Sequence, residues 1–172
     1  YDAKGNIVYK ETIRKVAEGV GHYEPLRHYA EVHLILEPGR PGSGLVFDTN
    51  CSEDELDRNW QRLVLTHLEE KIHRGVLTGA ELTDVQITLI AGRAHQKHTE
   101  GGDFREATYR AIRNALMYAD NVLLEPIAGF SLRAPADLYG TLTGALSRMQ
   151  ADVNIPEYED ESVIITGEAP YA

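Results

Sequence analysis

The fold is decided by the stretch from Gly79 to Pro126, which reads GAELTDVQITLIAGRAHQKHTEGGDFREATYRAIRNALMYADNVLLEP. Apolar residues alternate from Val85 to Leu89, and this period of two predicts a β-strand that ends at Gly92. The polar, basic loop Arg93–His98 follows, and an amphipathic helix then begins with Asp103 as its expected N-cap. The apolar stripe expected on this helix consists of Phe104, Ala107, Ala111, Ile112, Ala115 and Leu116. The strand and the helix therefore hold out a short tip with two histidines and two cations, a layout that is suited to contact with a partner.

Patterns before this stretch predict three further strands and a helix. An alternating run over Ile7–Val16 is expected to break at Gly19–Gly21, because paired glycines interrupt strands. The next strand, Tyr29–Leu36, places Ala30, Val32, Leu34 and Leu36 on one face, and Gly44–Asp48 is expected to pair with it as a hairpin. The pattern Ser52-x-x-Glu55 is typical of a capping box, so a helix is expected to follow it, with an apolar stripe that reaches Ile72.

A boundary is expected near Asp120-Asn121, which divides the chain into residues 1–121 and 122–172. The second part reads β-α-β-β, with a strand from Val122 to Arg133 and a helix that turns Leu138, Leu142, Leu146 and Met149 inward. The pattern as a whole predicts an α+β fold.

Composition and charge limit the class of protein. The 172 residues are 42% hydrophobic, which is enough for a core, and Cys51 is the only cysteine, which fits a reducing cytoplasm. No apolar run approaches the roughly 18 residues of a membrane span, and the chain begins at Tyr1 without a methionine, so we expect a piece of a longer protein. Taken alone, the net charge of −10 argues against a nucleic-acid partner, and DNA is not expected as one. Charge acts locally, however, over a Debye length of roughly 8 Å, and no acidic residue lies between Gly92 and Thr99.

Several ordered motifs resemble domains four and five of elongation factor G and of its relatives, the tetracycline-resistance ribosomal protection proteins. For domain four they are Gly75-Val76-Leu77-Thr78-Gly79, Asp84-Val85-x-x-Thr88-Leu89 and Gly92-x-x-His95. For domain five they are Val122-Leu123-Leu124-Glu125-Pro126, the segment Ala136–Gln150, and Val163-Ile164-Ile165-Thr166-Gly167-Glu168-Ala169-Pro170.

The resemblance implies a fold and a partner. Residues 1–121 would resemble the second domain of ribosomal protein S five, with its left-handed β-α-β crossover, and residues 122–172 the start of a ferredoxin-like unit. The resemblance also implies docking on the ribosome. The domain-four tip would then lie at the small-subunit rRNA of the decoding region, and domain five would lie near the GTPase-associated RNA. The parent would be a translational GTPase that uses GTP and magnesium, whereas this piece has no Walker sequence and is expected to hold no cofactor and to catalyse no reaction.

Two departures leave the branch of the family open. Where translocases carry a glycine-rich loop, this chain has His22-Tyr23-Glu24-Pro25-Leu26-Arg27-His28-Tyr29. Where the protection proteins carry Ser-Pro-Val at the tip, it has Gln96-Lys97-His98. The first departure favours a protection-like protein slightly over a translocase.

The residues expected to contact RNA come from both loops. Imidazoles donate and accept hydrogen bonds, and cations attract phosphates. These residues are His95, Arg93, Gln96, Lys97, His98, His22, Arg27 and His28. Ordinary solvated loops remain an alternative, as does a stand-alone RNA-binding or protein-interaction module without a GTPase. General acid–base work by His95 would require a pocket, and the His95/His98 pair lacks the further ligands of a zinc site.

Overall fold

The computed structural model describes residues 7–26, 28–95 and 99–171. It contains two compact units, one formed by Lys10–Leu124 and the other by the chain from Glu125 onward together with the described residues before Lys10. Within the described ranges, no helix is long and apolar enough to cross a membrane.

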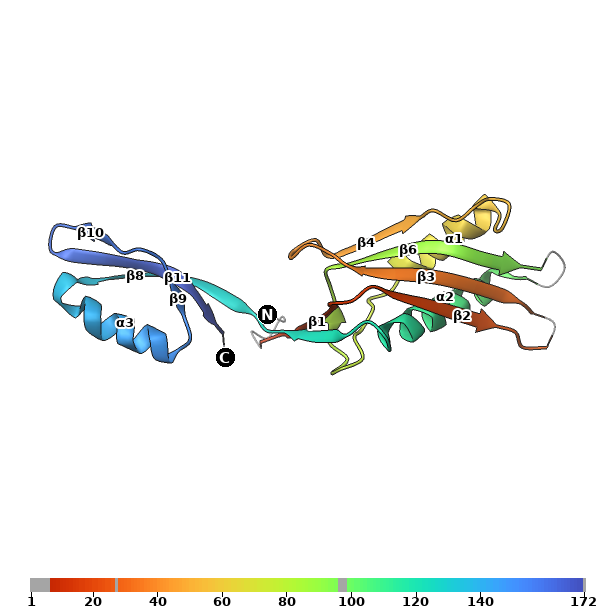
Figure 1. Ribbon diagram of the computed structural model, residues 1–172. Helices are drawn as coiled ribbons and strands as arrows, with labels where there is room; N and C mark the ends of the chain where they lie inside the picture. Colours follow the sequence, from red (N-terminus) through yellow and green to blue (C-terminus); the bar gives the residue numbers. More distant parts are fainter. Residues whose placement is uncertain (1–6, 27, 96–98, 172) are drawn as a thin grey trace. The chain divides into compact units, whose positions relative to one another are not determined.

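The larger unit is built on a four-stranded sheet in the order β2-β3-β6-β4 (Figure 1). Its strands are β2 (Ala17–Tyr23), β3 (Ala30–Pro38), β6 (Val85–Ala94) and β4 (Leu45–Thr49). Strand β3 runs antiparallel to both β2 and β6, and β4 runs parallel to β6. The α+β class expected from the sequence is confirmed at this level.

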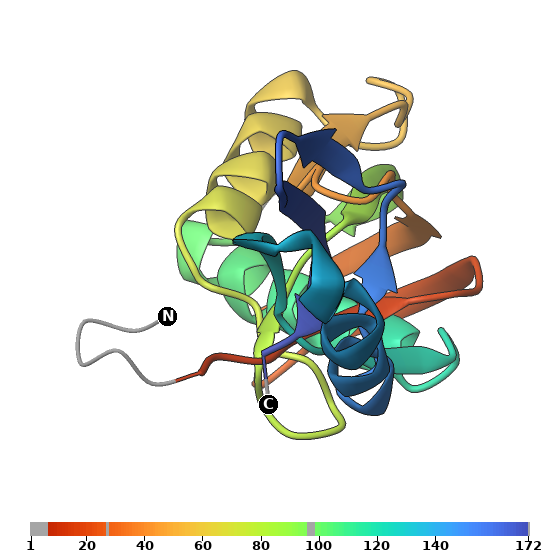
Figure 2. The same cartoon turned by 90° about the vertical axis from the view of Figure 1, so that its left-hand side faces the viewer.

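Two helices, α1 (Arg58–Glu69) and α2 (Gly101–Leu116), lie on the same side of this sheet (Figure 2). Strand β3 turns alternate residues toward them, and all four members of its predicted inward face are fully buried. From α2 the core receives the predicted apolar stripe, which consists of Phe104, Ala107, Ala111, Ile112, Ala115 and Leu116. The alternating inward face of β3 is thus buried together with the apolar stripe of α2, and this burial of apolar surface stabilises the unit.

The expected hairpin between β3 and β4 is wrong, because β6 lies between the two strands. Asp84, the residue just before β6, explains the insertion. Its carbonyl oxygen accepts the Gly39 N–H at 2.7 Å, and its carboxylate accepts the Gly44 N–H at 3.0 Å. The end of β3 and the start of β4 are therefore both bonded to the start of β6 rather than to each other.

The expected break at Gly19–Gly21 is also wrong, since both glycines lie inside β2 and face α2. A Cβ atom on Gly21 would lie 1.9 Å from the Ala107 carbonyl oxygen, and one on Gly19 would lie 2.1 Å from that of Ala111. The glycines permit a close approach of helix and strand, which is an established use of glycine inside strands.

The helix starts differ from those expected. Asp57, not Ser52, caps α1 by accepting the Asn59 N–H at 2.8 Å, and the helix ends at Glu69, so Ile72 lies beyond it and is exposed. Asp103 is not the N-cap of α2. It lies in the first turn, where its carboxylate accepts the Glu100 N–H at 2.8 Å.

A three-stranded sheet in the order β5-β1-β7 completes the larger unit. Its central strand β1 (Lys10–Ile13) is antiparallel to β7 (Asn121–Leu124) and parallel to β5 (Glu81–Leu82). Glu11 in β1 is fully buried, and its carboxylate accepts four hydrogen bonds of 2.8–3.1 Å from Leu77, Thr78 and Ala80. This one side chain therefore organises the loop that leads into β5.

The smaller unit is a β-sheet with one helix. It contains β8 (Ile127–Pro135), the short 3₁₀ helix η1 (Ala136–Leu138), α3 (Tyr139–Arg148), β9 (Asp152–Val153), β10 (Glu157–Glu159) and β11 (Ser162–Pro170). Strand β11 pairs antiparallel with β8, β9 and β10. The small core consists of Leu146, Val163 and Ile165 with partly buried neighbours, and the expectation that Leu138 and Met149 point inward is wrong because both are exposed.

Candidate functional site

The candidate site is one end of the four-stranded sheet, which we call the sheet tip and define as His22–Tyr29 and Arg93–Asp103. Strand β6 does not stop at Gly92 as expected but continues to Ala94, which pairs with Ala30. Strand β2 likewise continues to Tyr23, which also pairs with Ala30. Strands β2 and β6 therefore end where β3 begins, and the two predicted loops lie at the same end of the sheet.

Thr99 ties the two connections together. Its hydroxyl donates to the Tyr29 carbonyl oxygen at 2.7 Å and accepts the His95 N–H at 2.7 Å. The Thr99 N–H in turn donates to the His95 carbonyl oxygen at 3.1 Å. The backbone on both sides of the β6–α2 loop is therefore fixed against the residue just before β3.

Asp103 anchors the β2–β3 connection to the start of α2. Its carboxylate is nearly buried, and a carboxylate oxygen lies 3.1 Å from His28 Nδ1 while it also accepts the Glu100 N–H. A carboxylate in the first turn is favoured by the positive end of the helix dipole. His28, predicted as an RNA-contacting residue, is thus half-buried against Asp103.

The carboxylate of Glu31 offsets part of the positive charge of the tip. Glu31 of β3 accepts a hydrogen bond from the Tyr29 hydroxyl at 2.7 Å and lies 2.9 Å from His33 Nε2 and 3.6 Å from His22 Nε2. Burial acts to raise the pKa of Glu31, but the hydrogen bonds and the two histidines outweigh it and lower the pKa. The sequence shows no acid between Gly92 and Thr99, yet the sheet register places Glu31 directly beside Arg93.

The side chains of Arg93 and His95 are exposed at the tip. Arg93 lies near the end of β6, and His95 is the first residue after the strand. A cation and an imidazole held on a fixed backbone are able to engage an anionic or hydrogen-bonding partner. Four other predicted contact residues, Arg27, Gln96, Lys97 and His98, lie outside the described residues.

Sequence reasoning missed Arg110. It lies four residues after Glu106 on α2 and pairs with that carboxylate at 3.3 Å. The same guanidinium also donates to the His22 carbonyl oxygen at 2.8 Å and lies 5.4 Å from the centre of the Tyr23 ring. The signal was available, because Arg110 follows Asp103 by two helical turns on α2, but its use depends on α2 packing against β2.

Comparison with known proteins decides the family. Residues 5–120 match the family model described as elongation factor G, domain IV. The chain belongs to this domain IV family.

Similarity to individual known proteins extends beyond the residues that match the domain IV model. The chain is 33% identical over 156 residues to the tetracycline resistance protein TetM of Streptomyces lividans, covering 91% of this chain and 24% of that protein. It also matches a crystal structure of a protein from Thermus thermophilus at 26% identity with a TM-score of 0.85, covering 96% of this chain and 25% of the other. The domain IV-like chain therefore spans about a quarter of the length of each of these relatives.

Proposed function

We propose that this chain is the domain IV part, followed by the start of domain V, of a GTP-dependent translation factor. In this proposal the sheet tip docks on the RNA of the small ribosomal subunit near the decoding region. Membership of the domain IV family supports the class of protein. The observation that carries the site is that two connections converge on one end of the sheet and expose Arg93 and His95 there.

The chemistry of the tip suits RNA. Arg93 would contact backbone phosphate, since guanidinium groups bind phosphate oxygens with charge-assisted hydrogen bonds. His95 would hydrogen-bond to phosphate, to a 2′-hydroxyl or to an unpaired base. The other predicted residues, His22, Arg27, His28, Gln96, Lys97 and His98, are proposed to contribute from the same two connections.

The finer assignments belong to this proposal as well. We propose a left-handed β-α-β crossover from β4 through α1 to β6, as in the second domain of ribosomal protein S five. The residues from 122 onward would begin a ferredoxin-like domain V near the GTPase-associated RNA, after a domain IV that ends at residue 121. The parent would bind GTP and magnesium in another part of its chain and would act in the cytoplasm.

Protection against tetracycline is the favoured role within the family. The relationship to the tetracycline resistance protein TetM covers 91% of this chain, and the His22–His28 segment departs from the glycine-rich loop of translocases. The tip would then displace the antibiotic from its ribosomal site while the parent's GTPase controls docking.

The test uses the full-length parent protein. The double variant Arg93→Gln/His95→Ala should weaken GTP-dependent ribosome binding and release of tetracycline while leaving the unfolding temperature nearly unchanged. The dependence of ribosome affinity on salt should become weaker. The magnitude of the slope of log affinity against log salt should decrease by about one for each ion pair with phosphate that the substitutions remove. The matched control is Arg40→Gln, which removes the same charge from an exposed residue in the β3–β4 connection at the opposite end of the sheet.

Two results would reject the proposal. Equal effects of the Arg40 and Arg93/His95 variants would mean that only overall charge matters. Undiminished ribosome binding by the tip variant would mean that the tip is not the docking surface.

A further inference from the structure

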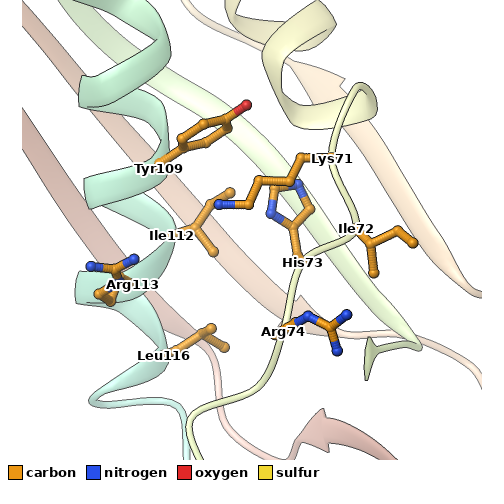
Figure 3. Close-up of a pocket in the computed structure, with 8 residues that line it drawn as sticks. All are labelled: Lys71, Ile72, His73, Arg74, Tyr109, Ile112, Arg113 and Leu116. Atoms are coloured by element: carbon orange, nitrogen blue, oxygen red, sulfur yellow. The ribbon is translucent and has the colours of Figure 1, made fainter. Parts of the chain in front are cut away.

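A second basic site lies away from the sheet tip, between α2 and the segment that follows α1. It is a cavity of about 220 Å³ inside the larger unit, shown in Figure 3. Its lining residues are Lys71, Ile72, His73, Arg74, Tyr109, Ile112, Arg113 and Leu116. Arg113 follows Asp103 by ten residues on α2, which places it about 15 Å along the helix axis from the tip.

The charge of this cavity is opposite to that of the chain. Three of the lining residues, Lys71, Arg74 and Arg113, are cations, and none of the residues given above as its lining is acidic. The chain as a whole has a net charge of −10. A concave site with low-dielectric walls focuses the field of its charges, so this cation group attracts anions more strongly than the net charge suggests.

The cations come from opposing elements. Figure 3 shows Lys71 extending across the cavity toward α2, with Arg74 on the segment after α1 and Arg113 on α2. The Lys71 ammonium lies 4.3 Å from the centre of the Tyr109 ring. Arg74 donates one guanidinium hydrogen bond to the Gly79 carbonyl oxygen at 3.1 Å, which leaves further donors on the same fork.

The groups around the three cations are paired among themselves. Glu70 is the nearest carboxylate in sequence, but it accepts hydrogen bonds from the Tyr109 hydroxyl at 2.7 Å and from Arg105 at 3.2 Å, and it lies 2.9 Å from His67 Nδ1. His73 is buried in the cavity wall with Nε2 2.7 Å from the Leu68 carbonyl oxygen, and burial lowers its pKa. Two isoleucines and a leucine complete the lining, and because Ile112 and Leu116 are buried, an anion would be partly shielded from water.

We propose that this cavity binds a phosphoryl group through Lys71 and Arg113, with Arg74 at its rim. Arginine and lysine together match the charge and the several acceptor oxygens of a phosphoryl group. The group is carried either by an RNA backbone or by a small phosphorylated ligand, and the two sources share the same chemistry. This site goes beyond the proposed docking of the sheet tip and does not depend on it.

The experiment titrates the 172-residue chain and follows the ring signals of Tyr109 and His73 by NMR. One arm adds inorganic phosphate and pyrophosphate, and the other adds a short single-stranded RNA oligonucleotide. Saturable shifts are expected at both rings, and Arg113→Gln should weaken binding about tenfold, as expected when a hydrogen bond to a charged group is removed. The matched control, Arg62→Gln, removes the same charge from an exposed position on α1 and should leave binding unchanged.

Each outcome decides the proposal. Binding of RNA without competition from millimolar phosphate, weakened about tenfold in Arg113→Gln, supports the site with an RNA backbone as source. Binding of phosphate or pyrophosphate alone, weakened to the same extent in this variant, supports it with a small ligand as source. Absence of saturable shifts with any probe, or equal weakening by Arg62→Gln and Arg113→Gln, overturns the proposal. A variant of the tip residues Arg93 and His95 should keep binding at the cavity, which separates failure here from failure of tip docking.

Discussion

The side chains of His28 and Asp103, 75 positions apart in the sequence, lie 3.1 Å from each other at the sheet tip. The contact joins the β2–β3 connection to the first turn of α2. The same carboxylate accepts the Glu100 N–H at 2.8 Å, so Asp103 stabilises the start of α2 and also holds His28 at the tip. The tip is therefore positioned by a buried polar side chain as well as by the strands beneath it.

Asp103→Ala should destabilise the larger unit. The substitution removes a first-turn carboxylate, leaves the Glu100 N–H without its acceptor and releases His28. We expect a loss of about 1–2 kcal/mol in the free energy of unfolding, measured by urea denaturation. His28→Ala keeps the helix contact, so its loss should be smaller. An equal or larger loss in His28→Ala would contradict the role given to Asp103.

Gly21→Ala tests the close approach of β2 and α2. A Cβ at this position would lie 1.9 Å from the Ala107 carbonyl oxygen, so strand and helix must separate. Overpacking of this kind costs about 1–3 kcal/mol in the free energy of unfolding. Gly102→Ala is the matched control, because a Cβ at Gly102 meets no atom within 4 Å and alanine favours the helix. The temperature of thermal unfolding should fall for Gly21→Ala and stay constant or rise for Gly102→Ala.

Glu11 should make stability depend on pH. Burial acts to raise the pKa of its carboxyl, but the hydrogen bonds from Leu77, Thr78 and Ala80 outweigh burial and lower the pKa below its ordinary value of 4.5. A lowered folded-state pKa contributes stability that is fully present above the unfolded value and is lost as the pH falls through the folded value. We therefore expect the unfolding free energy to decline as the pH drops below about 5.

Glu11→Gln tests this assignment. The amide cannot accept all four hydrogen bonds as a carboxylate does, so we expect a loss of about 1–3 kcal/mol at pH 7. The part of the acid-induced decline that is due to Glu11 should vanish in the variant, measured by urea denaturation between pH 3 and 7, a range chosen around the carboxyl titration (roughly pH 4). A variant that loses stability in parallel with the original protein across this range would exclude Glu11 as the titrating group.

Tyr109 should titrate at unusually high pH. Burial, the hydrogen bond to Glu70 and the charge of Glu70 raise the pKa of Tyr109 to about 12. Glu70→Gln removes the charge, so the Tyr109 pKa should move down toward its ordinary value of 10.0. The measurement is NMR titration of tyrosine rings labelled at the hydroxyl-bearing carbon. An unchanged Tyr109 titration in the variant would show that burial alone sets the pKa.

Patterns of side-chain burial were readable from the sequence because they follow local periodicity. The inward face of β3 and the apolar stripe of α2 were both predicted correctly, since periods of 2 and 3.6 identify the faces of strands and helices without knowledge of the partner. The exposure of Arg93 near the end of β6 and of His95 just after it was likewise predictable. Resemblance of ordered motifs also led to the right family.

Pairings between distant segments were decided only by the tertiary structure. The sequence suggested a hairpin of β3 with β4, whereas Asp84 bonds to Gly39 and Gly44 and so places β6 between the strands. It suggested that Gly19 and Gly21 break a strand, whereas they admit α2. It showed no acid between Gly92 and Thr99, whereas the register places Glu31 beside Arg93. Local periodicity determines which face of an element is buried, but contacts between segments depend on packing that a single segment does not encode.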